Sequence, residues 1–241
     1  MDLTRLFFSI IFSVYLVDAS AERECNIFAT ILREIDKEGF HRELTSLVEI
    51  VNVHSNIENC HLALQETLPS NVFVNPDELK SLARQGVLFA ESNSTIDIEA
   101  AESSSSPFAT LIYASENKVT HNLLSAEFLL PIHVRYHSPM DGINFYNFVI
   151  KRPILFIRCS KPLENIKGCD SLRTHDLPCN FHSSQKCKWY ELFYKTNAEK
   201  LYISVPVGNT KRTSLVIGIT FLVTISGCIC ILNSLFSFPI T

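Results

Sequence analysis

The sequence contains little of the material from which nucleotide sites and nucleic-acid surfaces are built. Glycine occurs only 7 times in 241 residues, and neither a phosphate-binding loop nor a GxSxG nucleophile motif is present. No two cysteines have the CxxC spacing of thiol oxidoreductases and zinc knuckles. The formal net charge is -4, which argues against nucleic acid or anionic lipid as the main partner. The sequence therefore predicts no cofactor and no metal site.

The first residues have the features of a secretory signal peptide. Arg5 precedes an apolar run over Leu6–Val17, and small residues follow up to Ala21. The run has 12 residues, too few to cross a hydrocarbon core of about 30 Å. We therefore predict a cleaved signal peptide over residues 1–21; an uncleaved anchor helix is the alternative.

The C-terminal region is apolar and has no charged residue after Arg212. Its apolar run covers Leu215–Phe236 and is 22 residues long, enough to span a bilayer at a rise of about 1.5 Å per residue. We predict a transmembrane helix over residues 214–236. A lumenal β domain over residues 22–213 and a short cytosolic tail over residues 237–241 complete a single-pass type I topology.

Two features of this region count against that topology. Lys211 and Arg212 would lie on the lumenal side, although cations near membrane helices favour the cytosolic side. The same tail also resembles a lipid-anchor signal with a cleavage region near Gly208. Its spacer is short for such a signal, so the membrane helix is the favoured interpretation.

Six cysteines precede the predicted membrane helix, and an even number in an oxidising compartment predicts disulfides. Six cysteines allow about 15 complete pairings, and the sequence does not choose among them. Cys228 and Cys230 lie in the membrane helix and are predicted to be packing residues. Asn93 begins the only glycosylation sequon and is expected on an exposed loop if it is used. The six disulfide candidates are Cys25, Cys60, Cys159, Cys169, Cys179 and Cys187.

About ten short runs rich in β-branched and aromatic residues, separated by turn residues, predict a mostly β, antiparallel, sandwich-like domain. In "CHLALQETL" the alternation puts Leu62, Leu64 and Glu66 on one face. Ser94–Ala100 is one of the predicted strands.

One short helix is expected within this domain. Asn75 can cap it, and Pro76 suits its first position. Glu78 is predicted to close a capping box, and Gly86 lies just beyond the expected end.

The stretch "HVRYH" contains His133 and His137, which would share one face of a helix and could then bind a metal. Pro131 and Pro139 bracket it and disfavour a helix. On a strand the two histidines would be about 13 Å apart, so they could not share an ion. We predict a structural strand with a polar face that meets water or a partner. The strand would direct His133, Arg135 and His137 to one face, and Ile132, Val134 and Tyr136 to the other.

An enzymatic alternative rests on few residues. Asp97 and Glu99 form an Asp-x-Glu pair that could hold a divalent ion in a sugar-nucleotide enzyme, but an exposed strand edge is the simpler interpretation. A lumenal enzyme would have to use His133, Arg135 or Asp97, and no pair of carboxylates stands out for glycosyl transfer.

The predicted membrane helix carries a stripe of small side chains. Small residues let helix backbones approach closely, so the stripe predicts a seam for another transmembrane helix. Ordinary apolar composition is the alternative explanation. The seam residues are Thr220, Thr224, Gly227 and Cys228.

Five short segments, in the same order along the chain, resemble the PIG-X family. Together they cover most of the chain after the signal; Ser160–Pro178 and the residues after Phe236 match poorly. The segments are "GFHREL" (39–44), "VNPDELKSL" (74–82), "LPIHVRYHSP" (130–139), "CKW" (187–189) and "VPVGNTKRTSLV" (205–216).

The resemblance implies a non-catalytic subunit of the glycosylphosphatidylinositol (GPI) mannosyltransferase I of the endoplasmic reticulum. Its implied partner is PIG-M, a multi-spanning enzyme that transfers the first mannose from dolichol-phosphate-mannose to the GPI precursor. A single membrane helix cannot itself enclose two lipid-borne substrates, which agrees with an accessory role. The alternative is a single-span cell-surface receptor or adhesion protein, which the predicted fold and topology fit equally well.

Overall fold

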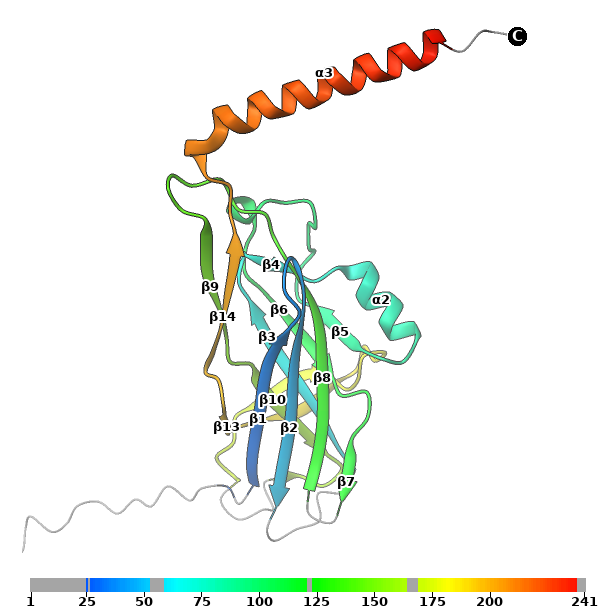
Figure 1. Ribbon diagram of the computed structural model, residues 1–241. Coiled ribbons are helices and arrows are strands. Elements are labelled where there is room, and N and C mark those ends of the chain that lie inside the picture. Colours follow the sequence, from blue (N-terminus) through cyan, green and yellow to red (C-terminus); the bar gives the residue numbers. More distant parts are fainter. Residues whose placement is uncertain (1–24, 26, 53–58, 121–122, 164–168, 238–241) are drawn as a thin grey trace, which may run out of the picture.

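The computed structural model describes residues 25, 27–52, 59–120, 123–163 and 169–237 (Figure 1). The predicted signal peptide lies outside these residues, as does most of the predicted tail. Over the described part the chain is mostly β, with a short helix beside the sheets and a long helix at the C-terminal end. The predicted fold class is confirmed.

The first sheet contains the three longest strands side by side, in the order β13-β1-β2-β8-β4, with β7 also paired to β8. All its pairs are antiparallel except β1 with β13. The strands are β1 (Ile27–Asp36), β2 (His41–Asn52), β4 (Val72–Phe73), β7 (Lys118–Thr120), β8 (Leu123–Val134) and β13 (Tyr194–Thr196).

The second sheet is antiparallel throughout, in the order β11-β12-β10-β3-β6-β5. A separate ribbon of β9 and β14 leads from the β domain to the long helix (Figure 1). The second sheet contains β3 (Cys60–Leu68), β5 (Phe89–Ser92), β6 (Phe108–Tyr113), β10 (Ile154–Cys159), β11 (Thr174–Pro178) and β12 (Lys186–Leu192). The ribbon contains β9 (Phe145–Lys151) and β14 (Lys200–Pro206).

Alternating side chains build the core between the two sheets. In β3 the predicted face of Leu62, Leu64 and Glu66 is buried, as expected. In β1 every second residue from Ile27 to Arg33 is buried and those between are exposed. One cluster of buried apolar residues joins both sheets and the β9–β14 ribbon. Each fully buried aliphatic or aromatic side chain contributes about 1.5–3 kcal/mol, so this cluster is the main source of stability.

A buried ion pair crosses the core. Arg33 of β1 donates from Nη2 to both carboxylate oxygens of Glu66 of β3, at 2.9 Å each. Its Nη1 donates to the backbone oxygen of Lys151 at 3.1 Å. Burial raises the pKa of Glu66 to about 7, although the charge and hydrogen bonds of Arg33 act in the opposite direction. The pair thus links β1 of the first sheet directly to β3 of the second.

All six cysteines of the β domain are paired. The bonds are Cys25–Cys169, Cys60–Cys159 and Cys179–Cys187. The second bond joins β3 to β10 at positions that are also partners in the sheet register. The structure thus chooses among the pairings that the sequence left open.

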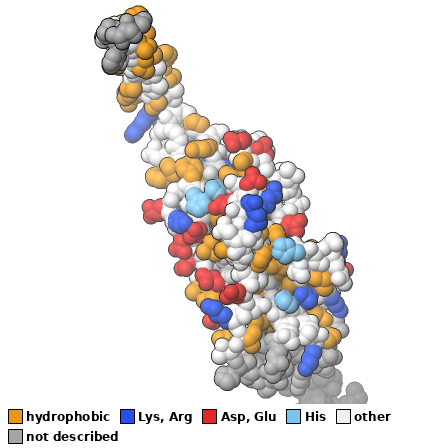
Figure 2. All heavy atoms as spheres, turned by 90° about the vertical axis from the view of Figure 1, so that its right-hand side faces the viewer, with side chains coloured by type: hydrophobic (Ala, Val, Ile, Leu, Met, Phe, Trp, Pro, Cys, Tyr) orange, Lys and Arg blue, Asp and Glu red, His pale blue; other side chains and the backbone are white. Residues whose placement is uncertain are grey.

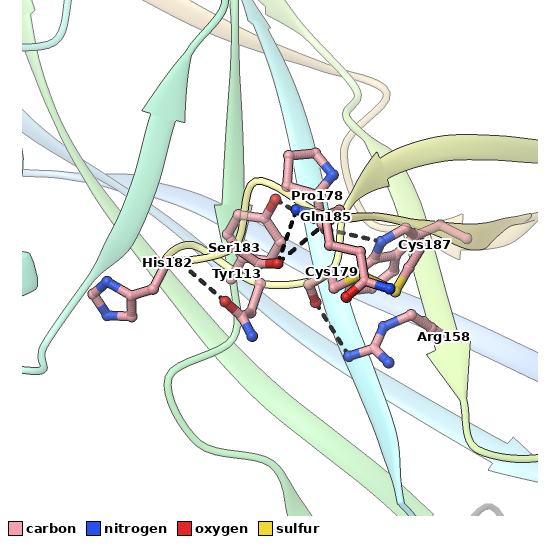
Figure 3. Close-up of a disulfide and its surroundings, with 10 residues drawn as sticks. Tyr113, Arg158, Pro178, Cys179, His182, Ser183, Gln185 and Cys187 are labelled. Atoms are coloured by element: carbon pink, nitrogen blue, oxygen red, sulfur yellow. Dashed lines mark hydrogen bonds between the residues drawn. A yellow bond between two sulfur atoms is a disulfide. The ribbon is translucent and has the colours of Figure 1, made fainter.

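The third disulfide closes a loop that covers the outer face of the second sheet (Figure 3). Tyr113 and Trp189 both donate to the backbone oxygen of Pro178, at 3.3 and 3.1 Å. Arg158 donates to the backbone oxygen of Cys179 at 3.1 Å. Trp189 is completely buried beneath this loop.

The predicted short helix is present as α2 (Pro76–Arg84). Asn75 Oδ1 accepts hydrogen bonds from the first-turn amides of Asp77 and Glu78, at 3.0 and 3.5 Å. Gly86 follows the helix with φ +73°, the left-handed conformation that glycine adopts easily. The Glu78 carboxylate was predicted to close a capping box at the start of this helix. It instead contacts His133 Nε2 at 2.9 Å.

The predicted strand Ser94–Ala100 is wrong, because this segment is irregular. Asp97 Oδ1 accepts a hydrogen bond from the amide of Glu99 at 3.0 Å, a local turn that competes with strand pairing. Glu102–Ser104 forms a short 3-10 helix, η1, soon afterwards. A second, η3 (Thr210–Arg212), leads into α3 (Thr213–Ser237).

Candidate functional site

The long helix α3 is apolar on all sides and exposed. It is long and apolar enough to cross a membrane, and none of its residues is buried. Figure 2 shows hydrophobic side chains over its surface and basic side chains at its base. A core helix of a soluble domain would be covered by other elements, so this surface is suited to lipid or to other membrane helices.

One face of α3 carries the predicted small residues. At about 100° per residue, Thr220, Thr224 and Gly227 lie within a narrow arc, with Cys228 at its edge. The hydroxyls of Thr220 and Thr224 donate to backbone oxygens four residues earlier, at 2.8 Å each. Because these hydroxyls are already bonded, the face offers close packing more than new hydrogen bonds between helices.

The two glycines of α3 point in opposite directions. Gly218 and Gly227 are nine positions apart, about 900° of rotation, so they lie on opposite sides of the helix. A Cβ atom added at either position meets nothing within 4 Å. A larger side chain at either position would therefore not clash with the described part of the chain. It would change only the contacts that α3 makes with another helix or with lipid.

The start of α3 is tied to the β domain. Met140 donates to the backbone oxygen of Gly208 at 2.8 Å and accepts from the amide of Thr210 at 3.2 Å. Asn209 Oδ1 accepts from the amides of Lys211 and Gly142, at 3.1 and 3.4 Å. These bonds join the loop before β9 to the segment between β14 and α3. A protein that packs on α3 would therefore also lie near this end of the β domain.

The "HVRYH" stretch is a strand only in part. β8 ends at Val134, which pairs with Val72 of β4. Beyond it, the amide of Arg135 donates to the backbone oxygen of Asn71 at 2.8 Å, outside any ladder. Arg135 is 5% exposed and Tyr136 is 76% exposed. The predicted alternation is therefore wrong after Val134, because the neighbouring strands end and the chain turns.

The two histidines of this stretch have different surroundings. His137 Nε2 lies 3.1 Å from Asn71 Nδ2, and its ring packs on Tyr146 at 4.5 Å between centroids. His133 instead lies between Phe73, stacked at 5.0 Å, and His41, edge-on at 4.7 Å. The prediction that His133 and His137 share one polar face does not hold.

Arg135 lines a pocket next to His133. The pocket has a volume of about 330 Å³ and is also lined by Phe40, His41 and Glu99. The Arg135 guanidinium donates to the backbone oxygen of Ala100 at 2.7 Å. Burial lowers the pKa of Arg135, and the charge of Asp97 acts in the opposite direction.

Sequence reasoning missed His41 and Glu78 as neighbours of His133. His41 and His133 are direct partners in the register of β2 and β8. Glu78 comes from α2, with Oε2 at 2.9 Å from His133 Nε2. Strand pairing alone could have brought His41 and His133 together; the position of Glu78 also depends on how α2 packs beside the sheet.

The remaining predicted site residues lie on the surface. Asn93 follows β5 and is exposed, while its Oδ1 accepts from the amide of Ala109 at 2.9 Å; its glycosylation stays a prediction. Asp97 and Glu99 are also exposed, in the irregular segment. Their local turn provides no support for the predicted enzymatic alternative.

Comparison with known proteins identifies the family. The family model described as PIG-X / PBN1 matches residues 37–236. The chain is 32% identical over 210 residues to a protein of Rattus norvegicus named "GPI alpha-1,4-mannosyltransferase I, stabilizing subunit", covering 86% of this chain and 82% of that protein. Proteins with the same name from Mus musculus (33% over 213 residues, 86% and 82%) and Homo sapiens (31% over 223 residues, 92% and 84%) are similar to the same extent. The match extends over both the disulfide-bonded β domain and α3, and the chain belongs to the PIG-X / PBN1 family.

Proposed function

We propose that this chain is a non-catalytic, stabilising subunit of GPI mannosyltransferase I in the membrane of the endoplasmic reticulum. One observation carries the proposal: the match runs from the β domain through α3 to proteins named as stabilising subunits of that enzyme. The catalytic partner is PIG-M, a multi-spanning protein that adds the first mannose to the GPI precursor. The β domain lies in the lumen, α3 spans the membrane, and residues 237–241 face the cytosol.

Stabilisation has a definite physical meaning here. A subunit that binds the folded partner and not its unfolded or mispacked forms shifts the partner's population towards the folded form. When the subunit is present at about 100 times its Kd, the folded partner is stabilised against unfolding by about 2.7 kcal/mol. No chemistry by this chain is required, so the surfaces that matter are those that contact PIG-M.

Two surfaces of the chain fit this role. The face of α3 with Thr220, Thr224 and Gly227 provides a contact within the membrane, because small side chains allow close helix packing. The end of the β domain that is hydrogen-bonded to the start of α3 lies at the lumenal end of the same helix and covers lumenal loops of the partner. The bonds of Met140 and Asn209 keep the two surfaces together.

The helix contact can be tested with two glycine substitutions in the full-length chain. Cells that lack this gene are complemented with the wild type, Gly227→Leu or Gly218→Leu, and PIG-M that co-purifies is quantified. GPI-anchored proteins at the cell surface are measured in parallel by flow cytometry. We expect Gly227→Leu to reduce co-purification about tenfold, equivalent to about 1.4 kcal/mol. Gly218→Leu makes the same chemical change on the opposite face and is the matched control.

The outcomes separate the parts of the proposal. If the wild type restores neither PIG-M nor surface GPI-anchored proteins, the assignment as a stabilising subunit is wrong. If both variants behave like the wild type, the small-residue face is not the contact. Accumulation of the mature chain at the plasma membrane without any mannosyltransferase would instead support the receptor or adhesion alternative.

A further inference from the structure

Three side chains able to bind a metal ion converge from segments that are far apart in the sequence. They are His41 of β2, Glu78 of α2 and His133 of β8, and their ligand atoms all lie within 4.8 Å of one another. His133 Nε2 and Glu78 Oε2 are already 2.9 Å apart. Among the residues that the structure describes, this is the only such group of three.

Strand register and helix capping explain why the three residues meet. His41 and His133 are partners across β2 and β8, so their side chains leave the same face of the sheet. Phe73 of β4 is the next partner of His133 and stacks on its ring at 5.0 Å. The chain then turns at Asn75, whose side chain caps α2 and so fixes the first turn that carries Glu78. The arrangement therefore depends on several independent contacts.

We propose that His41, Glu78 and His133 form a zinc-binding site. Two imidazole nitrogens and one carboxylate oxygen suit Zn²⁺, whereas Ca²⁺ and Mg²⁺ prefer oxygen ligands alone. With metal–ligand bonds of about 2.0–2.2 Å, tetrahedral ligand atoms lie about 3.4 Å apart. Because no two ligand atoms are more than 4.8 Å apart, they would have to approach one another by at most about 1.4 Å to bind one ion. The side chains of His133 and Glu78 are 25% and 30% exposed and are therefore not locked in the core.

The surroundings provide room for a fourth ligand. The pocket of about 330 Å³ is lined by His41 and His133 and gives an ion and a water molecule a route from solvent. Glu99 lines the same pocket and adds negative charge. Arg135 is a cation nearby, but it lies over the Phe73 ring and donates to the oxygen of Ala100. Bound zinc would cross-link α2 to the β2–β8 pair.

A simple ion pair between His133 and Glu78 is the competing explanation, and the chain contains a matched control for it. His175 and Glu191 form a second such pair, with Nε2 and Oε2 2.8 Å apart. No third ligand joins that pair to make a comparable group in the described part of the chain. If pairing alone accounted for the geometry, the two pairs would behave alike towards zinc.

The test uses the full-length chain, purified in detergent without its partner and freed of metal with a chelator. The affinity for zinc is measured by isothermal titration calorimetry. The amount of zinc that stays bound after dialysis is measured by elemental mass spectrometry. We expect about one zinc ion per chain, with at least tenfold weaker binding in His41→Gln, Glu78→Gln and His133→Gln. His175→Gln should bind zinc like the wild type, and the fluorescence of Trp189 reports whether each variant is folded.

Cobalt provides a second measurement that needs no variant. Co²⁺ in a tetrahedral site of two imidazole nitrogens, one carboxylate oxygen and one water molecule should give intense visible absorption bands, which added zinc should abolish by displacing the cobalt. The proposal is overturned if the wild type binds no zinc and shows no such bands. It is also overturned if the three substitutions leave binding unchanged, or if His175→Gln weakens it equally. Because no partner is present, these outcomes do not depend on the proposed role in GPI synthesis.

Discussion

Removal of the buried arginine between the two sheets should destabilise the β domain strongly. In Arg33→Met, Glu66 keeps its place in the core but loses both hydrogen bonds at 2.9 Å. The side chains of the pair are 0% and 1% exposed, so water cannot replace the guanidinium. Breaking a buried pair by removing one partner costs about 3–5 kcal/mol. We expect a loss of this size at pH 8, where the buried Glu66 carboxyl is left without its partner.

The loss should depend on pH in a definite direction. Beside Arg33, burial raises the pKa of Glu66 to about 7, from an ordinary value of 4.5. Without Arg33 the pKa rises further, because the two effects that lowered it are gone. A folded state with a raised carboxyl pKa binds a proton more readily than the unfolded state, so its stability falls as pH rises from about 4.5 towards the folded pKa. The loss of stability in Arg33→Met relative to the wild type should therefore be larger at pH 8 than at pH 5. The difference is at most about 1.4 kcal/mol, because only about one pH unit separates pH 8 from the wild-type pKa of about 7.

A double substitution separates the charge from the packing. In Arg33→Met with Glu66→Leu no charge remains in the core, and apolar replacements of buried pairs are often neutral or stabilising. We expect this chain to be more stable than Arg33→Met at pH 8 and to lose the pH dependence. The free energy of unfolding can be measured by urea titration of the full-length chain in detergent, followed by the fluorescence of Trp189. This is the only tryptophan and it is completely buried. A loss below about 1 kcal/mol at pH 8, or a double variant less stable than the single one, would refute the reasoning.

Two other predictions concern the disulfides and the sequon. Replacing Cys60 and Cys159 with alanine opens a loop of sequence separation 99 and should cost about 4–5 kcal/mol, whereas opening Cys179–Cys187, of separation 8, should cost about 2–3 kcal/mol. Urea midpoints of the two double variants check this order, and a reversed order contradicts it. Asn93→Gln should remove one glycan and increase gel mobility in the same way as glycosidase treatment of the wild type; equal mobility of the untreated variant and wild type means that Asn93 carries no glycan.

Much of the fold could be predicted because local patterns and packing agree. Every second residue of β3 was predicted to face the core. The structure confirms this, because Leu62, Leu64 and Glu66 are all buried. Asn75 and Gly86 mark the two ends of α2 because capping and left-handed turns depend on single residue types. The helix α3 could be predicted without any knowledge of tertiary contacts, because the length of its apolar run is sufficient.

The remaining errors arise where tertiary contacts decide the structure. Arg135 was predicted on a polar strand face, but β8 ends at Val134 once its neighbouring strands end. Thr174–Pro178 forms a strand at the edge of the second sheet although it begins with three polar residues and ends in proline. Edge positions tolerate both. The contact of His41 with His133 depends on the pairing of β2 with β8, which a single sequence does not reveal.

The central claim is that this chain stabilises a mannosyltransferase subunit and performs no chemistry itself. The most direct measurement is the half-life of PIG-M in a pulse-chase experiment, in cells with and without this chain. We predict that loss of the chain shortens the half-life of PIG-M severalfold and that forced overexpression of PIG-M partly restores surface GPI-anchored proteins. An unchanged half-life, with GPI-anchored proteins lost and not restored by overexpression, would contradict the account, because the chain would then be needed for the reaction itself.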